Sequence, residues 1–402
     1  MRKILILAMS LEIGGAEKSL VNILNLLDYS ECQVDLLLFQ KRGAFLAQVP
    51  SSVHIVDANR EIVILFQSFL TTLRRKSDRK LSFVLLSVRR YLYTLLSTMK
   101  YRQFDRIRIN RWVQYYNNLI PEPKQKYDIA IAYSGGETLY YMVDKVRANR
   151  KITYYHSDYS KINIDNRLEE TFLDRTDAVV TISNICASSL AELFPNQSNK
   201  IRVMPNLTSP SIIRNMGEKF FPREFLSIRG KSIIVSVGRL HPIKGFDIAV
   251  EAAEQLRAHG KQFVWFVIGE GNERKALEKQ IRKKKLQHVF TLLGSRVNPY
   301  PYIKNADIFV QPSRFEGKSV VLDEAKILCR PIVVTNYNSV TDQIKNMETG
   351  IIAPITASGI TDAVDSLLSH PELRNKLVEN LSKIDFNVQK QVENFQNFVE
   401  GI

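Results

Sequence analysis

Residues 313–325, SRFEGKSVVLDEA, place two glutamates eight positions apart where an apolar run meets a helix-like segment. The preceding residues 307–312 are short, apolar and ended by proline, which predicts a buried strand. Ser319 is a residue type that caps helices, and a helix start directs unpaired N–H groups and a positive dipole end toward whatever precedes it. We therefore predict a phosphate site here, with Glu316 on the loop and Glu324 inside the helix accepting hydrogen bonds from sugar hydroxyls.

A second strand-to-helix junction carries cations. Residues 236–247, SVGRLHPIKGFD, follow the strand-like run 233–237 and precede an apolar-periodic helix from Ile248. Arg239 and Lys244 suit a diphosphate, because arginine binds it bidentately and lysine acts as a point charge. Taken alone, these cations and the two glutamates also fit solvated surface charges. Their combination favours a ligand site.

The amino end contains a third junction of the same kind. Residues 3–9 predict a first strand, and Gly14-Gly15-Ala16-Glu17 opens a helix that runs to about Leu27. By themselves the two glycines fit an ordinary strand-to-helix turn as well.

With these residues the chain resembles the retaining glycosyltransferases of family 4, which have the GT-B fold. The resemblance rests on four ordered motifs: Gly14-Gly15-Ala16-Glu17, Gly238-Arg239-Leu240 with Lys244-Gly245, Gly269-Glu270-Gly271, and Glu316 with Glu324. It covers most of the chain outside about residues 60–126, and the order of the motifs is more specific than any single glycine-rich turn. It implies an α/β chain of two Rossmann-like domains that face each other across a cleft.

Alternating strand-like and helix-like segments predict parallel sheets covered by helices. We expect strands at residues 34–39, 128–133, 151–155, 178–182, 201–204, 232–237, 263–268, 289–292, 308–311 and 331–335. The predicted domains span residues 1–207 and 208–386, with residues 209–231 as a linker between them. The resemblance implies that a carboxyl-terminal helix within residues 387–402 crosses back to the first domain.

The resemblance also implies roles for single residues. Glu316 would hold hydroxyls of the transferred sugar, and Glu324 would accept from the ribose hydroxyls of the donor. Arg239 and Lys244 would neutralise the diphosphate and so stabilise the charge on the leaving group.

Further donor contacts are expected around these groups, and they come from Gly14, Gly15, Gly317, Lys318, Ser319 and Val320. The amides of Ser319 and Val320 would bind phosphate from the helix end. Lys318 either adds a phosphate contact or is solvated.

His156, in the stretch YYHSD, follows a predicted strand and matches the family's histidine near the reacting sugar. It would position the donor and favour positive charge at the anomeric carbon. The alternative is a histidine that only satisfies local hydrogen bonds. Elsewhere the chain departs from the family's pattern at Cys329, where glycine is common.

The family retains anomeric configuration, so the resemblance implies a retaining transfer in which the donor phosphate takes the acceptor proton. Glu316 is not a nucleophile in this scheme, unlike one carboxylate of the retaining glycosidases. We expect a nucleotide-sugar substrate, with UDP as the first candidate, and no cofactor. No metal is expected, because the resemblance implies a family without an Asp-x-Asp metal site, and the sequence shows no convincing metal cluster.

The charge of the chain is uneven. Its net charge is +15, and residues 60–126 contain fifteen Lys or Arg against four Asp or Glu, a net of +11. Basic clusters at residues 74–76, 79–80 and 89–90 alternate with aliphatic and aromatic residues, which suits an anionic membrane surface. Such charge would also suit nucleic acid, but no nucleic-acid motif accompanies it.

A helix over residues 101–116 would place Phe104, Ile107, Trp112 and Tyr115 on one face, with arginines intruding. We expect this region to contact the membrane. The alternative is a helical insertion packed on the first domain.

A basic insertion on the acceptor-binding domain predicts a lipid-linked saccharide acceptor, used for a capsule, an exopolysaccharide or another cell-envelope polymer. Three cysteines without metal or disulfide spacing fit a reducing compartment. The apolar run 4–9 passes into Glu12 and is too short for a signal peptide, and no run reaches the length of a spanning helix. We therefore expect a cytoplasmic protein, peripheral on the inner face of the membrane.

Two other functional classes fit the same motifs. A different GT-B sugar enzyme would be an epimerase, which needs no acceptor, or a phosphorylase, which consumes phosphate. A non-catalytic protein would keep the fold and use the basic region to hold nucleic acid or a partner glycosyltransferase. The complete set of Glu316, Glu324, Arg239, Lys244 and His156 argues against lost catalysis.

Overall fold

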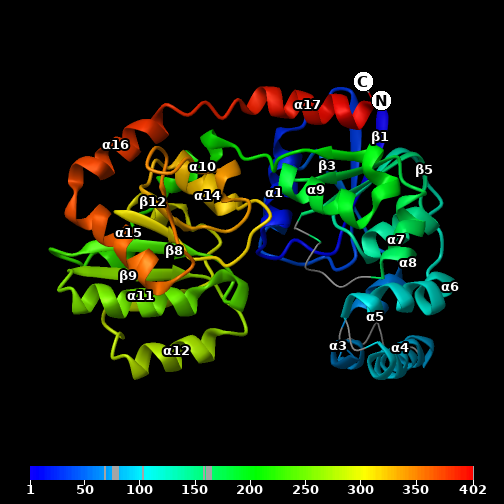
Figure 1. Ribbon diagram of the computed structural model, residues 1–402. Coiled ribbons are helices and arrows are strands. Elements are labelled where there is room, and N and C mark those ends of the chain that lie inside the picture. Colours follow the sequence, from blue (N-terminus) through cyan, green and yellow to red (C-terminus); the bar gives the residue numbers. More distant parts are fainter. Residues whose placement is uncertain (68, 75–80, 102–103, 157–158, 160–164, 402) are drawn as a thin grey trace. The chain divides into compact units, whose positions relative to one another are not determined.

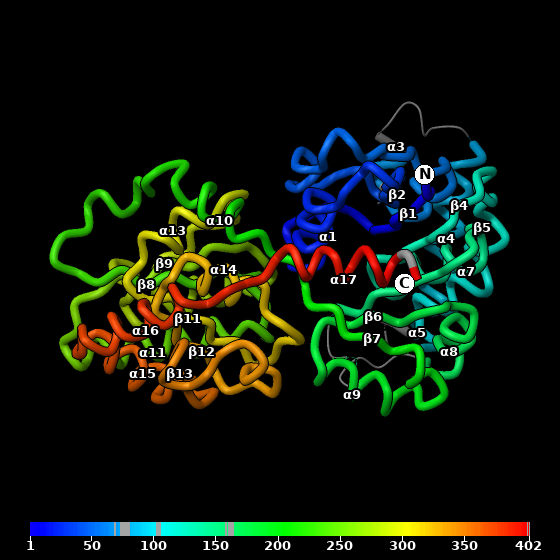
Figure 2. The backbone as a smooth tube through the Cα atoms, turned by 90° about the horizontal axis from the view of Figure 1, so that it is seen from above, coloured from blue at the N-terminus to red at the C-terminus, as the bar shows by residue number. Residues whose placement is uncertain are grey.

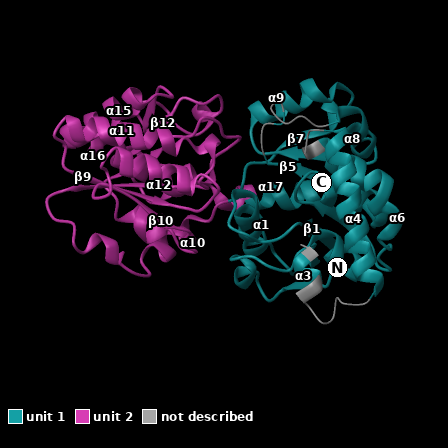
Figure 3. Ribbon diagram, turned by 90° about the horizontal axis from the view of Figure 1, so that it is seen from below, with its two compact units in different colours: residues 1–207, 392–402 teal, residues 208–391 magenta. Residues whose placement is uncertain are grey.

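The computed structural model describes residues 1–67, 69–74, 81–101, 104–156, 159 and 165–401. The chain forms two compact units, each built on a parallel β-sheet with helices packed on it (Figure 1). Unit 1 contains Met1–Leu207 and Val392–Ile402, and unit 2 contains Thr208–Gln391 (Figure 3).

Within the described residues, the sheet of unit 1 has seven parallel strands in the order β3-β2-β1-β4-β5-β6-β7. These strands are β1 (Arg2–Ala8), β2 (Cys32–Leu38), β3 (Val53–Val56), β4 (Lys126–Ala132), β5 (Arg147–Tyr155), β6 (Ala178–Thr181) and β7 (Ile201–Val203). The chain builds outward from β1 to β3 and then returns to place β4 on the other side of β1. The direction of winding therefore reverses between β1 and β4.

Both faces of this sheet are buried. Leu5 and Leu7 belong to one hydrophobic core, whereas Ile4 and Ile6, which alternate with them, belong to the core on the opposite face. Apolar residues at consecutive positions are what a parallel sheet covered on both faces requires.

The helices of unit 1 cover these faces and form the insertion. They are α1 (Gly15–Leu26), α2 (Arg60–Phe66), α3 (Phe69–Arg74), α4 (Leu81–Lys100), α5 (Phe104–Arg111), the π-helical turn η3 (Trp112–Tyr116), α6 (Asn117–Leu119), α7 (Glu137–Lys145), α8 (Asn166–Leu173), α9 (Asn184–Leu193) and the carboxyl-terminal α17 (Val388–Glu400). Short 3₁₀ turns lie at Leu46–Gln48 and Pro195–Lys200.

The predicted membrane face of residues 101–116 is instead part of the core. Ile107 and Trp112 are buried, and the Trp112 indole N–H donates to Asp144 Oδ2 at 2.8 Å. Tyr115 is half-buried and stacks on Tyr93. The expectation that this face contacts a membrane is wrong for Ile107 and Trp112, because unit 1 itself covers them; the side chain of Phe104 lies outside the described ones.

Helix α17 packs on unit 1, although the residues before it belong to unit 2 (Figure 2). Phe395 and Val399 are buried in the same core as Ile4 and Ile6. Arg150 Nη1 donates to the carbonyl oxygens of Phe398 at 2.6 Å and Val399 at 3.1 Å. A cation at these last carbonyls stabilises the helix end.

Unit 2 has six parallel strands within the described residues, in the order β10-β9-β8-β11-β12-β13. The strands are β8 (Ser232–Val237), β9 (Phe263–Ile268), β10 (Phe290–Gly294), β11 (Ile308–Gln311), β12 (Ile332–Thr335) and β13 (Ile351–Ala353). The helices are α10 (Pro210–Gly217), α11 (Phe246–Ala258), α12 (Arg274–Lys283), α13 (Tyr300–Lys304), α14 (Val320–Ile327), α15 (Ala357–Ser369) and α16 (Pro371–Ser382), with 3₁₀ turns at Arg223–Phe225, Pro242–Lys244 and Val340–Asp342.

The predicted linker 209–231 is part of unit 2 and contributes two buried side chains to its core. Ser209 caps α10 by accepting from the Ile212 N–H, and Pro210 occupies the first turn, where its missing N–H costs nothing. Ile213 and Phe225 are buried against the sheet. The proline that suggested a linker in fact starts a helix.

No helix among the described residues has the length and apolar character needed to cross a bilayer.

Candidate active site

The site begins at the point where the sheet of unit 2 changes its direction of winding. Strands β8 and β11 are neighbours, but the chain continues from β8 to β9 on one side and from β11 to β12 on the other. The loops that leave such a pair diverge and form a crevice beyond the carboxyl ends of the strands. Lys244 follows β8 and Glu316 follows β11.

The two loops are held together by backbone contacts and an ion pair. Gly245 has φ +65°, and a Cβ at this position would lie 2.0 Å from the Pro312 carbonyl oxygen. The Arg314 N–H donates to the Ile243 carbonyl at 2.8 Å, and the Arg314 guanidinium pairs with both oxygens of Asp247 at 2.7 and 2.5 Å. These contacts fix Lys244 beside Glu316.

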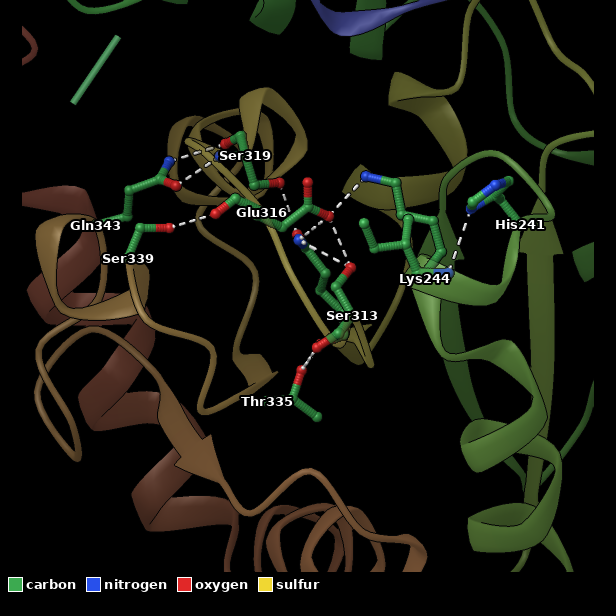
Figure 4. A network of polar contacts seen from close by, with 10 residues as sticks. His241, Lys244, Ser313, Glu316, Ser319, Thr335, Ser339 and Gln343 are labelled. Atoms are coloured by element: carbon green, nitrogen blue, oxygen red, sulfur yellow. Dashed lines mark hydrogen bonds and ion pairs between the residues drawn. The ribbon is translucent and has the colours of Figure 1, made fainter. Parts of the chain in front are cut away.

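The Glu316 carboxylate is the centre of the network (Figure 4). Its Oε1 accepts from Lys244 Nζ at 2.6 Å, Ser313 Oγ at 2.7 Å and Gln311 Nε2 at 3.0 Å. The side chains of Glu316 and Lys244 are 11 % and 24 % exposed. Within the part of the chain that is described, all three donors converge on one oxygen, so Oε2 remains available to a ligand hydroxyl.

The start of α14 differs from the prediction. Ser319 occupies the N-cap position, but its hydroxyl donates to Gln311 Oε1 at 2.8 Å instead of capping the helix. The Ser319 N–H donates to Gln343 Oε1 at 2.7 Å, and Gln343 Nε2 donates to the Ser319 carbonyl at 2.8 Å. The predicted phosphate contact from the Ser319 amide is wrong in this conformation, because Gln343 already occupies that donor. Val320 begins α14.

The remaining predicted donor residues lie around this network without joining it. Arg239 is exposed after β8 and forms no ion pair with any described residue. Glu324 lies inside α14 and is 1 % exposed, and the Tyr300 hydroxyl donates to its Oε1 at 3.3 Å. Gly317 is buried. The structure thus brings Glu316 and Lys244 together and places Glu324 in a separate, buried contact.

Lys318 is half-buried, so it is not the solvated lysine that one alternative predicted. Burial lowers the pKa of its amine, an effect that Asp323 opposes and Lys326 reinforces. An anionic ligand group next to Lys318 would stabilise the charged form of its amine.

Four polar residues of the network were not predicted. Gln311 and Ser313 flank Pro312, and a glutamine at the end of an otherwise apolar strand is the signal that could have identified the first. Gln343 and Ser339, whose hydroxyl donates to the Glu316 carbonyl oxygen at 2.8 Å, come from a segment after β12. No local pattern marks these last two.

In unit 1, His156 follows β5 and is packed against aromatic rings. Its Nε2–H donates to the Tyr133 carbonyl at 3.0 Å, and its ring lies 4.7 Å from that of Tyr133 and 5.5 Å from that of Tyr154. Burial lowers the pKa of His156 to about 4, and the hydrogen bond to the Tyr133 carbonyl opposes this effect. The imidazole is therefore neutral at pH 7. Ser157 and Asp158 of the same stretch lie outside the described residues.

Gly14 and Gly15 begin α1 at the carboxyl end of β1. Gly14 has an extended backbone, and a Cβ there would meet the Glu17 carboxylate of the same turn. Their predicted approach to a diphosphate stays a prediction.

The described residues contain no group of three or more His, Cys, Asp or Glu side chains arranged to hold a metal ion.

Comparison with known proteins identifies the segment that carries the network. Residues 218–383 match the family described as Glycosyl transferases group 1. The chain is 32 % identical over 165 residues to the alpha-D-kanosaminyltransferase of Streptomyces kanamyceticus, covering 40 % of this chain and 43 % of that protein. It is 29 % identical over 171 residues to WcaL of Salmonella typhimurium, a glycosyltransferase assigned to colanic acid biosynthesis, covering 39 % and 42 %. The matched segments thus span less than half the length of these curated relatives.

A solved structure covers the whole chain. The structure of HepE from Anabaena in complex with UDP-glucose has a TM-score of 0.70, at 17 % sequence identity, and the match covers 100 % of both chains. This likeness confirms the predicted GT-B fold with two Rossmann-like domains.

Proposed function

We propose, from the match of residues 218–383 to the family described as Glycosyl transferases group 1, that the chain is a retaining glycosyltransferase. It moves a hexosyl or related sugar from a nucleotide-sugar donor to a lipid-linked saccharide acceptor at a membrane. UDP is the first candidate nucleotide, since HepE was solved with UDP-glucose. The product belongs to a capsule, an exopolysaccharide or another cell-envelope polymer, in keeping with the colanic acid assignment of WcaL.

One observation carries the donor site. The Glu316 carboxylate, with one oxygen saturated by three donors of which one is Lys244 at 2.6 Å, lies where the strand order of unit 2 reverses. Preorganised groups of this kind need no rearrangement when charge develops on a bound ligand. The spare Glu316 oxygen suits a sugar hydroxyl, and Lys244 suits the adjoining phosphate.

In the proposed reaction, the bond from the anomeric carbon to the donor phosphate oxygen breaks as a bond to the acceptor oxygen forms on the same face of the sugar. The acceptor proton passes to the released phosphate oxygen. Lys244 and the exposed Arg239 offset the negative charge of the leaving diphosphate, and Glu324 holds the ribose. Neutral His156 acts from unit 1 by accommodating positive charge at the anomeric carbon.

The proposed transfer requires no divalent ion, because Lys244 and Arg239 would neutralise the diphosphate in place of a metal. Turnover should be unchanged in excess EDTA. A loss that added Mg²⁺ or Mn²⁺ restores would contradict this part of the proposal.

Nucleotide release tests the function itself. The full chain is incubated with UDP- and GDP-sugars and a lipid extract of bacterial membranes, and free nucleotide is measured. Acceptor-dependent release that Glu316→Gln abolishes supports a transferase, and NMR of the product then shows whether the anomeric configuration is retained. Release without any acceptor, or conversion of the sugar on the nucleotide, would contradict it.

Helix α4 gives the membrane proposal its structural basis. Its exposed side chains include Leu81, Leu85, Leu92, Leu96 and Met99, which recur at helical spacing. An apolar helix face beside basic residues inserts at the surface of an anionic bilayer. Peripheral attachment at the inner face of the cell membrane follows from this proposal.

Not every basic residue of the insertion serves such a surface. Arg108 and Arg111 pair with the buried Glu137, and Arg90 donates to the Leu65 carbonyl at 2.9 Å. Arg89 is exposed. The clusters at residues 75–80 lie outside the described residues.

Vesicle flotation tests the α4 surface. We expect Leu92→Ser with Leu96→Ser to reduce binding to phosphatidylglycerol vesicles, and salt to weaken the binding of the unaltered chain. Leu226→Ser is the matched control, because Leu226 in unit 2 is 68 % exposed and Leu96 is 65 % exposed. Equal binding by the α4 variant and the unaltered chain would remove α4 from the proposal.

A further inference from the structure

Unit 1 contains a cavity that none of the predicted donor-site or catalytic residues lines. Its volume is about 630 Å³, and it lies beyond the carboxyl ends of β2 and β3, against α2 and α3. The cavity lies at the carboxyl-end edge of the sheet, beyond β2 and β3 and not at the switch between β1 and β4, and its volume is that of a small-molecule site. The cationic lining residues are Lys41, Arg42 and Arg60, and the large apolar ones include Phe39, Val63 and Phe66.

The charge of the cavity favours an anion. Among its described lining residues, three cations face a single carboxylate, that of Asp57. Lys41 Nζ lies 2.9 Å from Asp57 Oδ1, and Arg42 Nε lies 3.2 Å from Glu12 Oε1. All four of these side chains are at least half exposed. Pairs of this kind contribute little stability, so a phosphate can replace the carboxylates at little cost.

The walls of the cavity are firmly attached. Gln40 Nε2 donates to the Phe66 carbonyl at the end of α2, and the rings of Phe39 and Phe66 lie 5.0 Å apart. Arg90 of α4 donates to the carbonyl oxygens of Leu65 and Gln67. The cations therefore project from a fixed frame, and the frame is bonded to the helix whose apolar face is exposed.

We propose that this cavity binds the phosphate of a lipid-linked acceptor, an inference that rests on the proposed transferase function. Several cations suit a phosphate or diphosphate better than a single carboxylate, and the apolar wall suits the hydrocarbon next to it. Because α2 and α3 both contact α4, the phosphate site and the proposed membrane surface belong to one helical layer. An acceptor whose lipid stays in the bilayer can thus place its phosphate among Lys41, Arg42 and Arg60.

Calorimetry with soluble probes tests the site. The probes are citronellyl diphosphate, inorganic pyrophosphate and citronellol, titrated into the full chain at about 150 mM salt, where screening suppresses nonspecific charge effects. We expect citronellyl diphosphate to bind more tightly than the other two. Arg42→Gln and Lys41→Gln should each weaken it at least about tenfold, the effect of one lost phosphate contact.

Arg147→Gln is the matched control. Arg147 pairs with Glu122 at 3.1 Å, with exposed fractions of 66 % and 51 %, and Arg42 pairs with Glu12 at 3.2 Å, with 65 % and 53 %. Both variants remove one exposed cation from unit 1, but only Arg42 lines the cavity. Equal effects of the two variants would mean nonspecific attraction and would overturn the proposal.

A second variant, Lys244→Ala, distinguishes binding in the cavity from binding in the donor site. In Lys244→Ala, citronellyl diphosphate binding should persist and still depend on Arg42. Loss of that binding in Lys244→Ala would place the probe in the donor site, and an absence of any binding would equally overturn the proposal. Pyrophosphate that binds as tightly as citronellyl diphosphate would indicate a free-phosphate site. UDP titrations of the same samples show whether the donor proposal survives such a result.

Discussion

The corner after β4 in unit 1 has Glu137 as the first residue of α7, and the corner after β11 in unit 2 has Glu316 just before α14, but the two corners hold the carboxylate differently. In unit 1 both oxygens of Glu137 are paired, Oε2 with Arg108 Nε at 2.8 Å and Oε1 with Arg111 at 3.1 Å. Gly136 has φ +79°, and a Cβ there would lie 2.1 Å from the Arg108 guanidinium. The side chain of Glu137 is 4 % exposed.

In unit 2 the donors converge on one oxygen of Glu316 and leave the other available. Both corners follow strands at which the sheet order reverses, where ligands bind in folds of this class. The insertion has filled the corner of unit 1 with its own arginines. A carboxylate with both oxygens paired serves the fold, whereas one with a spare oxygen can serve a substrate.

The largest expected effect is on the stability of unit 1. Glu137→Gln leaves Arg108 and Arg111 without their counter-charge, and we expect the free energy of unfolding to fall by about 3–5 kcal/mol. Denaturation followed by Trp112 fluorescence in a Trp265→Phe background reports on unit 1. Glu122→Gln, which breaks the exposed pair with Arg147, should change the free energy of unfolding by less than about 0.5 kcal/mol. Similar losses in both variants would contradict the comparison.

The corresponding change in unit 2 should affect turnover and spare the fold. Glu316→Gln keeps the shape of the side chain but removes its charge, and we expect kcat to fall by about 10²–10³. Unfolding followed by Trp265 fluorescence should change little. Near-normal turnover would remove Glu316 from the proposed site.

The buried histidine of unit 1 predicts a pH effect. The pKa of His156 is about 4 in the folded chain and 6.5 ordinarily, so the unfolded state takes up the proton first as pH falls. The contribution of His156 to the free energy of unfolding is therefore fully present above pH 6.5 and is lost as the pH falls toward 4, by up to about 3 kcal/mol. His156→Asn should lose this slope, and the exposed His288→Asn should keep it. An unchanged slope in His156→Asn would show that the histidine titrates normally.

The smallest effect concerns Cys329, just after α14. It has φ +50°, a left-handed conformation that favours glycine at a helix end. Cys329→Gly should raise the free energy of unfolding of unit 2 by about 1 kcal/mol. Destabilisation would mean that packing of the thiol outweighs the relief of backbone strain.

The sequence predicted every described strand except β3 and β13, which have four and three residues. Strands of the same lengths, β11 and β7, were predicted, so shortness alone does not explain the omission. α10 was missed because Pro210 suggested a break, although proline is favoured in the first turn of a helix.

The residues of the candidate site also fall into two groups, those that the sequence could predict and those that it could not. Lys244 and Glu316 stand in local motifs, so their roles could be predicted, whereas Gln343 reaches Ser319 only through the tertiary fold. The arginines of α5 interrupted its apolar face in the sequence. The structure explains them, because Arg108 and Arg111 point to the buried Glu137 and the apolar residues beside them join the core.

The most direct test of the donor site is calorimetric binding of UDP, GDP and their common sugar conjugates to the unaltered chain, Lys244→Ala and Lys383→Ala. Lys383 is the control, since it pairs with Glu379 at 2.6 Å, the same distance as Lys244 from Glu316. We predict selective binding of one nucleotide and its sugar conjugate, weakened at least about tenfold by Lys244→Ala and unchanged by Lys383→Ala. Equal binding by the two variants, or no binding of any nucleotide, would contradict a donor site between β8 and β11.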